Sequence, residues 1–300
     1  TQSKTASAGW YNNKAVEARA MQEGLYAKAL DGGAFSDAMR EQVLETIKAD
    51  LGQIDLVVYS LASPVRQHPK TEVLHRSSIK PLGEVLEIKT VHVEKGEVSN
   101  VALEPATEQE IADTVTVMGG EDWQYWIDAL LAADLLAPKA KTVAYTYIGS
   151  ELTWPIYWEG TLGKAKADLD RASGEIQQKL QSIGGDARVA VLKAIVSQAS
   201  AAIPVVPLYA ALLFQVMKEQ GSHEECIEHI DRLFVSQLQT GASMRLDDSG
   251  RIRVDNLELA EPVQAEVKRR WPLVDTENLP QLGDLAGFRA DFLKIFGFGI

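Results

Sequence analysis

The sequence is poor in cysteine and in long apolar runs. Cys226 is the single cysteine among 300 residues, which excludes an internal disulfide framework and is typical of a reducing compartment. No run approaches the roughly 18 consecutive apolar residues that a membrane-spanning helix needs, and no signal-peptide pattern is present. These absences predict a soluble, cytoplasmic protein.

Positive charge is also scarce. The 30 lysine and arginine residues face 42 aspartate and glutamate residues, and the formal net charge is −12. A chain of this sign repels nucleic acid and anionic membranes, so we expect neither as a partner. Residues 66–80 are an exception because they are locally basic. They would meet phosphate groups if they follow the end of a strand, although a solvated loop is an equally good interpretation.

Two glycine-rich motifs are absent as well. The sequence contains neither a G-x-G-x-x-G nor a Walker phosphate loop. Without a Gly-x-Ser-x-Gly elbow, and with no strand-to-helix turn beside Cys226, acyl-enzyme chemistry is not expected. The chain opens at Thr1 within a polar stretch and without a methionine, so we expect further residues upstream.

Strand and helix patterns alternate along the first third of the chain. Residues 25–30 are a short strand candidate, and Ser36 or Asp37 caps a predicted helix that stops at Gly52. Residues 54–59 form a nearly continuous apolar run of the kind a central parallel strand requires. This order predicts an α/β fold with a mostly parallel sheet.

Two β-hairpins are expected as additions to this pattern. One is an insertion at about 82–104, where two alternating runs flank a charged turn, and the other surrounds residues 247–250. Residues 203–217 are apolar on almost every side, which indicates either a buried helix or a lid, so a substrate-covering segment is expected at about 200–220. No repeat or linker divides the chain, and residues 1–300 are interpreted as a single domain.

The most informative stretch runs from residue 142 to residue 183. A short apolar run ending at Gly149 indicates a buried strand, and from about Glu159 a helical pattern begins. One helix stripe contains Leu162, Ala165, Leu169, Ala172, Ile176, Leu180 and Ile183. Lys166 shares this inward face, whereas Lys164 lies about 200° from Leu162 and points elsewhere. A lysine on an apolar stripe is costly to bury unless its charge is needed there.

Two tyrosines precede this lysine. Tyr157 lies nine residues before Lys166, and Tyr147 lies near the carboxyl end of the predicted strand. Ligands of open α/β sheets bind beyond such strand ends, so two phenols and an ammonium group could form a reactive site there. The alternative is that both tyrosines pack in the core while Lys166 extends to solvent.

A metal site is not expected. His223 and His229 flank several carboxylates, but zincin-type ligation needs histidines four residues apart on one helical face, and these are six apart. A solvated helix face explains the segment better.

Four blocks of sequence resemble a known family. They are YSLASPVRQHP, EPATEQEIADTVTVMGGEDW, TVAYTYIGSELTWPIYWEGTLGKAKADLDRA and IPVVPLYAALLF. The chain resembles the NADH-dependent trans-2-enoyl-thioester reductases, which comprise enoyl-acyl-carrier-protein reductases and trans-2-enoyl-CoA reductases of the Tyr-x8-Lys type within the short-chain dehydrogenase superfamily. The resemblance runs from Gly9 to Phe298. It implies a Rossmann-like, doubly wound sheet with extra C-terminal helices, of which the first βα portion precedes Thr1.

The resemblance also implies roles for individual residues. Tyr157 matches the proton donor, Lys166 the motif lysine that holds the nicotinamide ribose, and Tyr147 a second tyrosine that faces the thioester. The implied cofactor contacts are Leu61, Ala62, Gly33, Ala34, Ile195, Val196 and Ser197. Relatives tend to have an aspartate near the adenine where this chain has Gly33. The commoner Tyr-x6-Lys spacing would select Lys164 instead.

The activity implied is reduction of a 2-enoyl thioester by NADH in fatty acid biosynthesis, with hydride added at Cβ and tyrosine-assisted protonation of the enolate. Lys166 is expected to lower the pKa of the Tyr157 phenol. The expected partner is an acyl-carrier-protein or CoA thioester, and the expected state is a monomer. A carbonyl reductase of the same superfamily, or a non-catalytic binding module if Thr1 is the true start, are the alternatives.

Overall fold

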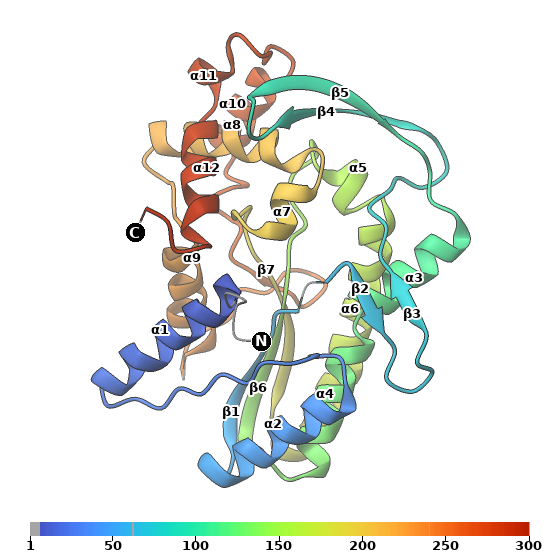
Figure 1. Cartoon of the computed structure of the whole chain (residues 1–300), viewed down its shortest axis with the longest axis vertical. Coiled ribbons are helices and arrows are strands. Elements are labelled where there is room, and N and C mark those ends of the chain that lie inside the picture. Colours follow the sequence, from blue (N-terminus) through green and yellow to red (C-terminus); the bar gives the residue numbers. More distant parts are fainter. Residues whose placement is uncertain (1–6, 62, 240, 300) are drawn as a thin grey trace, which may run out of the picture.

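The computed structural model describes residues 7–61, 63–239 and 241–299 (Figure 1). A four-stranded parallel sheet lies at its centre, in the order β1-β6-β7-β8. The strands are β1 (Ile54–Tyr59), β6 (Leu136–Thr146), β7 (Asp186–Val191) and β8 (Ile252–Arg253). Their apolar runs suit this position, since a parallel sheet is covered on both faces. The predicted α/β fold class is confirmed.

Three helices cover one face of the sheet. They are α2 (Asp37–Asp50), α4 (Glu121–Ala132) and α6 (Thr161–Leu180). Trp123, Ile127 and Ile176 are fully buried against small strand residues such as Ala144, which let the helices approach closely. Apart from Thr161, the buried residues of α6 are those of the predicted stripe up to Leu180, because one apolar side turns towards the sheet.

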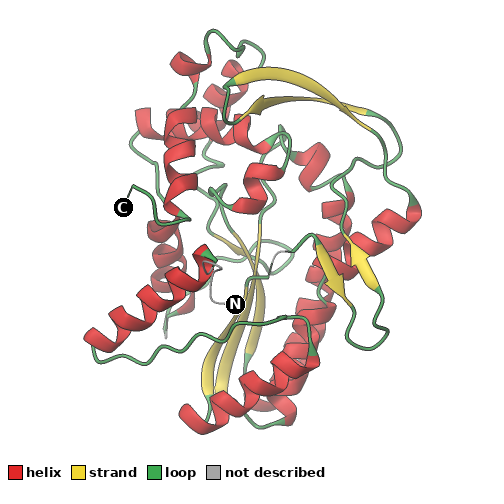
Figure 2. Cartoon of the chain, viewed as in Figure 1, coloured by secondary structure: helices red, strands yellow, loops and turns green. Residues whose placement is uncertain are grey.

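The opposite face of the sheet is covered by residues 226–238. Helix α9 (Cys226–Leu233) and the π-helical turn η2 (Phe234–Leu238) place Leu233 and Leu238 against Val143, Ala190 and Ile252. Helices therefore flank the central strands on both sides (Figure 2), which is the doubly wound arrangement.

Helix ends follow the local sequence signals. Ser36 accepts a hydrogen bond from the Met39 amide and caps α2, as predicted. Thr107 and Glu110 form a complete capping box at the start of α3 (Glu108–Met118). Helix α1 (Ala8–Gln22) begins after the Ser7 cap, whose side chain accepts a hydrogen bond from the Trp10 amide.

Antiparallel ribbons extend from the sheet. The predicted hairpin insertion forms from β4 (Leu86–His92) and β5 (Glu97–Leu103) and arches over one end of the molecule (Figure 1). Two residues of the hairpin, Ile88 and Val91, are buried in the apolar clusters that it covers. A second ribbon, β2 (Val65–Gln67) with β3 (Leu74–Arg76), was not predicted and contains most of the basic segment.

Two strand predictions were wrong. Residues 25–30 form no strand, and Leu25 is 66% exposed, because no neighbouring strand among the described residues pairs with them. The hairpin expected around residues 247–250 is reduced to one bridge between Leu246 and Ile252. Ile252 and Arg253 pair with β7 in parallel instead, because the central sheet buries Ile252 completely.

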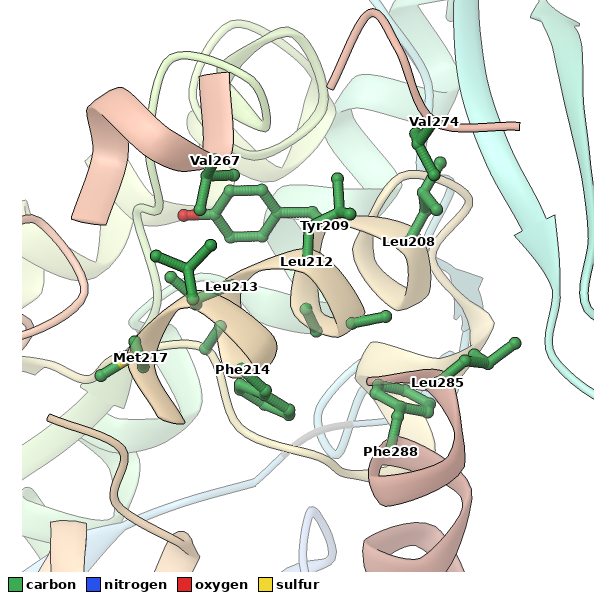
Figure 3. Packing of buried hydrophobic residues seen from close by; sticks show 14 of the residues in the cluster. Leu208, Tyr209, Leu212, Leu213, Phe214, Met217, Val267, Val274, Leu285 and Phe288 are labelled. Carbon is green, nitrogen blue, oxygen red and sulfur yellow. The ribbon is translucent and has the colours of Figure 1, made fainter. Parts of the chain in front are cut away.

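Helix α8 (Val206–Glu219) forms the centre of a second core (Figure 3). Its side chains are buried on nearly every side, as the apolar sequence predicted. It packs against α10 (Glu261–Arg270) through Val267 and against α12 (Leu285–Lys294) through Phe288. The short helices α5 (Trp154–Tyr157), α7 (Gln198–Ala202) and α11 (Leu279–Leu282) lie near it, whereas η1 (Gln181–Ile183) continues α6 and packs against the central sheet. Of the two interpretations of residues 203–217, a buried helix is the one observed.

Across the described part of the chain, no helix combines the length and the apolar character needed to cross a bilayer.

Candidate active site

A cavity of about 320 Å³ lies beyond the carboxyl ends of the central strands. Its walls come from the end of β6, from the segments that follow β1, β6 and β7, and from helices α5, α6, α7 and α8. The lining residues are Ser60, Leu61, Tyr145, Thr146, Tyr147, Tyr157, Lys166, Leu192, Lys193, Ala194, Ile195, Ser197, Ala199, Ser200 and Val206. This is the edge at which parallel α/β sheets bind their ligands.

Lys166 reaches this cavity from α6. Its Nζ donates a hydrogen bond to Thr146 Oγ1 at 2.9 Å and lies 5.5 Å from the centre of the Tyr157 ring. Desolvation lowers the pKa of Lys166 to about 8, against an opposing effect of Asp170. Lys164, two residues earlier, is exposed. Lys166 was predicted over Lys164 from their angular positions on the helix, and Lys166 is the one whose side chain lines the cavity.

Tyr157 is held in the cavity wall by the turn that follows β6. Gly149 has a φ of +75°, which allows the chain to reverse there, and the Thr153 hydroxyl donates to the Ser150 carbonyl at 2.9 Å. The one-turn helix α5 follows and leaves Tyr157 only 7% exposed. Tyr147 lies against it edge to face, with ring centres 4.7 Å apart. The two predicted phenols and Lys166 are therefore brought together.

One electrostatic expectation was wrong. Burial, and after it the charge of Glu258, raises the pKa of Tyr157, whereas Lys166 was expected to lower it. Desolvation disfavours the phenolate strongly in so closed a position, and the charge of Lys166 does not offset it. Tyr157 is therefore a protonated phenol at neutral pH.

Glu258 is the residue that the sequence reasoning missed. It lies in the turn after β8, is fully buried, and accepts hydrogen bonds from Tyr147 Oη at 2.9 Å and Tyr209 Oη at 2.8 Å. The Ala194 amide donates to its other oxygen at 2.5 Å. No motif surrounds Glu258 in the sequence, and it is 111 residues from Tyr147. Only the pairing of β8 with β7 brings it here.

The expected cofactor contacts divide into two groups. Leu61, Ile195 and Ser197 line the cavity, and Val196 lines a neighbouring hollow that shares Ile195. Gly33 borders a separate hollow next to the β2–β3 ribbon, and Ala34 lies beside it in the loop before α2. Ala62 lies outside the described residues. The structure thus brings the residues after β1 and β7 to one place and leaves the Gly33 loop at a distinct one.

The basic segment is largely neutralised within the protein. Arg66 is 1% exposed, pairs with Glu121 at 2.9 Å and donates to the Thr116 carbonyl. Lys80 pairs with Glu110 at 2.7 Å. Arg66 therefore neither lies in a solvated loop nor is available to a phosphate group. Its charge fixes the β2–β3 ribbon against α3 and α4.

The histidine segment is likewise structural. His229 is fully buried; its Nε2 accepts from the Lys193 amide at 3.2 Å and its Nδ1 lies 3.0 Å from Glu224. His223 packs edge to face on Phe214. Neither the solvated helix face nor a metal site describes His229. Over the described ranges, no group of three or more metal-binding side chains occurs.

A Rossmann-like sheet with a Tyr-x8-Lys pair at its strand ends defines a protein of the short-chain dehydrogenase class. Comparison with known proteins gives the family within that class. Residues 4–239 match the model of the trans-2-enoyl-CoA reductase catalytic region, and residues 246–300 match that of the enoyl reductase FAD binding domain. The chain belongs to the trans-2-enoyl-CoA reductase family.

Individual relatives are similar along the whole chain. The enoyl-[acyl-carrier-protein] reductase [NADH] of Tolumonas auensis is 57% identical over 299 residues, covering 100% of this chain and 75% of that protein. The enzyme of the same name from Opitutus terrae is 53% identical over 297 residues, covering 99% and 75%. The structure of Treponema denticola trans-2-enoyl-CoA reductase in complex with NAD superposes with a TM-score of 0.95 at 45% identity, covering 100% and 75%.

The described residues 246–299 do not fit a flavin. Helices α10 and α12 use their apolar sides, including Val267 and Phe288, to pack on α8. Two hollows border this segment. One is lined by Asp275, Glu277 and Lys89 and the other by Asp291, Lys294 and Lys193, so neither is a cluster of positive charge for a diphosphate. The segment's contribution to the central site is the carboxyl group of Glu258, and no chemistry is assigned to a flavin.

Proposed function

We propose that this protein reduces the C2=C3 double bond of trans-2-enoyl thioesters with NADH, in fatty acid biosynthesis. One observation supports this above all: Tyr157, Tyr147 and Lys166 line a single cavity in a chain that is 57% identical to an enoyl-[acyl-carrier-protein] reductase [NADH]. The trans-2-enoyl-CoA reductase of Treponema denticola, which superposes on the whole chain, supports the same reaction.

The cavity fits the reactive half of NADH. Apolar walls from Leu61 and Ile195 suit the flat nicotinamide ring, and the Lys166 ammonium is a donor for ribose hydroxyls. Ser197 supplies a further hydroxyl at the rim. When bound, NADH supplies the hydride that adds to Cβ of the enoyl group.

Tyr157 provides the acid for the second half of the reaction. Its hydroxyl makes no hydrogen bond to any other described residue and lines the cavity, and its raised pKa keeps the proton in place. A hydrogen bond from this phenol to the thioester oxygen stabilises the enolate where its charge develops, an effect typically worth about 10²–10³ in rate. Tyr147 lies close enough to orient the same carbonyl, and Val206 of α8 lines the acyl side.

The experiment follows NADH oxidation by its absorbance with crotonyl-CoA and with acetoacetyl-CoA. We expect turnover with the enoyl thioester and little with the ketoacyl thioester. Preference for acetoacetyl-CoA would identify a carbonyl reductase, and no turnover with either would leave only a binding function.

Tyr157→Phe is the matching variant. We expect kcat to fall by about 10²-fold or more while the Kd for NADH stays nearly unchanged, because the lost hydroxyl faces the thioester. The Kd is measured by fluorescence titration. Wild-type turnover in Tyr157→Phe would refute the assignment of this residue.

The thioester is carried by acyl-carrier protein or CoA, and we propose that both are accepted. Kinetics with crotonyl groups on each carrier compare the two. We propose further that the protein is a cytoplasmic monomer, which light scattering and cell fractionation test.

A further inference from the structure

Glu258 places a buried carboxyl group against Tyr147, which lines the cavity, and no described residue of opposite charge forms an ion pair with it. Tyr147 and Tyr209 both donate to its Oε1, and the Ala194 amide donates to its Oε2. The nearest ammonium, Lys193 Nζ, donates to the Ala194 carbonyl instead. The reaction as derived above makes no use of this carboxyl group.

The hydrogen-bond pattern fixes which way most of these protons point. Gln264 Nε2 donates to Tyr209 Oη at 3.0 Å, and Tyr209 Oη donates in turn to Glu258 Oε1 at 2.8 Å. A backbone amide can only donate, so Oε2 is an acceptor in every state. The remaining variable is the bond between Glu258 and Tyr147. An ionised carboxylate can only accept, and it then holds the Tyr147 proton away from the cavity.

We propose that Glu258 is a positioning residue whose protonation sets the direction of the Tyr147 hydrogen bond. Neutral Glu258 donates its proton to Tyr147 Oη, and the Tyr147 hydroxyl is then free to donate to the thioester carbonyl beside Tyr157. Ionised Glu258 accepts from Tyr147, which then offers the substrate oxygen only lone pairs. The inference rests on the proposed function and adds a protonation-dependent donor to it.

The surroundings of Glu258 bear on how it titrates. Burial raises the pKa of its carboxyl group, and the bonds from Ala194, Tyr209 and Tyr147 together with the charge of Lys193 oppose this. Tyr157 faces it from α5, Tyr209 from α8 and Lys193 from the segment after β7. The neutral form therefore persists above the usual pH range of a glutamate, and kcat/KM should fall as pH rises through this pKa.

Glu258→Gln tests the proposal in the full chain. The Ala194 amide selects the glutamine carbonyl, so its NH₂ group donates to Tyr147 Oη at every pH, as neutral Glu258 does, while Tyr209 loses its acceptor at this position. With crotonyl-CoA and NADH, we expect kcat/KM at low pH to stay within a few-fold of wild type. The alkaline descent caused by ionisation of Glu258 should disappear, whereas a descent caused by loss of the Lys166 charge should remain. The control is Glu261→Gln, an exposed carboxylate of the same segment, which should keep the wild-type profile.

A second measurement does not depend on turnover. Butyryl-CoA presents the same thioester carbonyl but no double bond, and calorimetry gives its Kd across the pH range. Wild-type affinity should weaken about tenfold as Glu258 ionises, whereas Glu258→Gln should show no such step. Equal pH dependence in both proteins would overturn the role of Glu258. Failure of wild type to oxidise NADH with crotonyl-CoA would overturn the proposed function instead, and the binding experiment would still decide the role of Glu258.

Should Glu258→Gln fail to fold, Tyr147→Phe provides the same information. It removes the hydroxyl that Glu258 governs, so turnover should be lower and the Glu258 descent absent. A Tyr147→Phe profile that keeps this descent contradicts the proposal.

Discussion

At Lys166, the ammonium group lies beside the cavity rather than in bulk water, and its pKa falls to about 8 through desolvation. The unfolded chain therefore binds the proton more tightly than the folded protein does. Folded stability is reduced below about pH 8 and rises with pH towards the unfolded value of 10.5. In the proposed function the same charge holds the ribose, so function and stability would oppose each other at this residue.

Lys166→Met should separate these two effects. At pH 7 we expect activity to be lost and Tm to rise by about 2–4 °C, the shift that roughly 1 kcal/mol gives in a chain of this size. The gain should shrink as pH approaches 10. Lys164→Met, on the exposed side of the same helix, is the control and should alter neither Tm nor kcat. A lower Tm for Lys166→Met at pH 7 would show that the ammonium stabilises the fold.

The site illustrates what sequence can and cannot reveal at this scale. Lys166 was found because residues four apart share one face of a helix, so its position relative to Leu162 predicts its direction without knowledge of the rest of the fold. Tyr147 and Tyr157 flank a strand-to-helix connection, which is also a local signal. Glu258 depends on a two-residue strand joining the far side of the sheet, and nothing near it in the sequence indicates that pairing.

At the scale of elements, the junction between α5 and α6 positions Tyr157. A Cβ added to Gly163 would lie 1.8 Å from the Trp158 carbonyl oxygen, so α6 can approach the preceding turn only through a glycine. Gly174, on the same helix, has no atom within 4 Å of such a Cβ. The two positions therefore form a matched pair.

Gly163→Ala should destabilise the protein by about 1–3 kcal/mol, because the backbone of Trp158 must move, and should lower kcat by displacing Tyr157. Gly174→Ala should stabilise it by about 0.5–1 kcal/mol and leave kcat unchanged. Chemical denaturation and steady-state kinetics measure both effects. Equal stability of the two variants would contradict the close contact at Trp158.

Elements with strong periodicity were predictable, and those that depend on partners were not. The stripe of α6 and the all-round apolar sequence of α8 specify burial regardless of topology. A strand, by contrast, needs a neighbour: residues 25–30 have the composition of a strand but no partner, whereas Ile252 and Arg253 have one. The β2–β3 ribbon was missed because its stability comes from the buried ion pairs of Arg66 rather than from alternation.

At the scale of the whole molecule, two cores meet around the site. The first core lies against the central sheet, and the second core forms around α8 and the C-terminal helices. Glu258 joins them, since it bonds to Tyr147 and Ala194 after the strands and to Tyr209 on α8. If residues 1–300 are a single domain, as the sequence predicts, we expect this connection to couple the folding of both parts.

Phe288→Ala tests this coupling. The side chain is fully buried against α8, so its loss should reduce the free energy of unfolding by about 3–5 kcal/mol. In a single domain, calorimetry should show one transition that moves to lower temperature as a whole, and NADH binding should be lost at the same temperature. Phe298→Ala, whose side chain is 63% exposed, is the control and should change neither quantity by more than about 0.5 kcal/mol. Two separate transitions in Phe288→Ala, with NADH binding retained through the first, would mean that the C-terminal helices fold apart from the sheet and that Glu258 is not held by a common core.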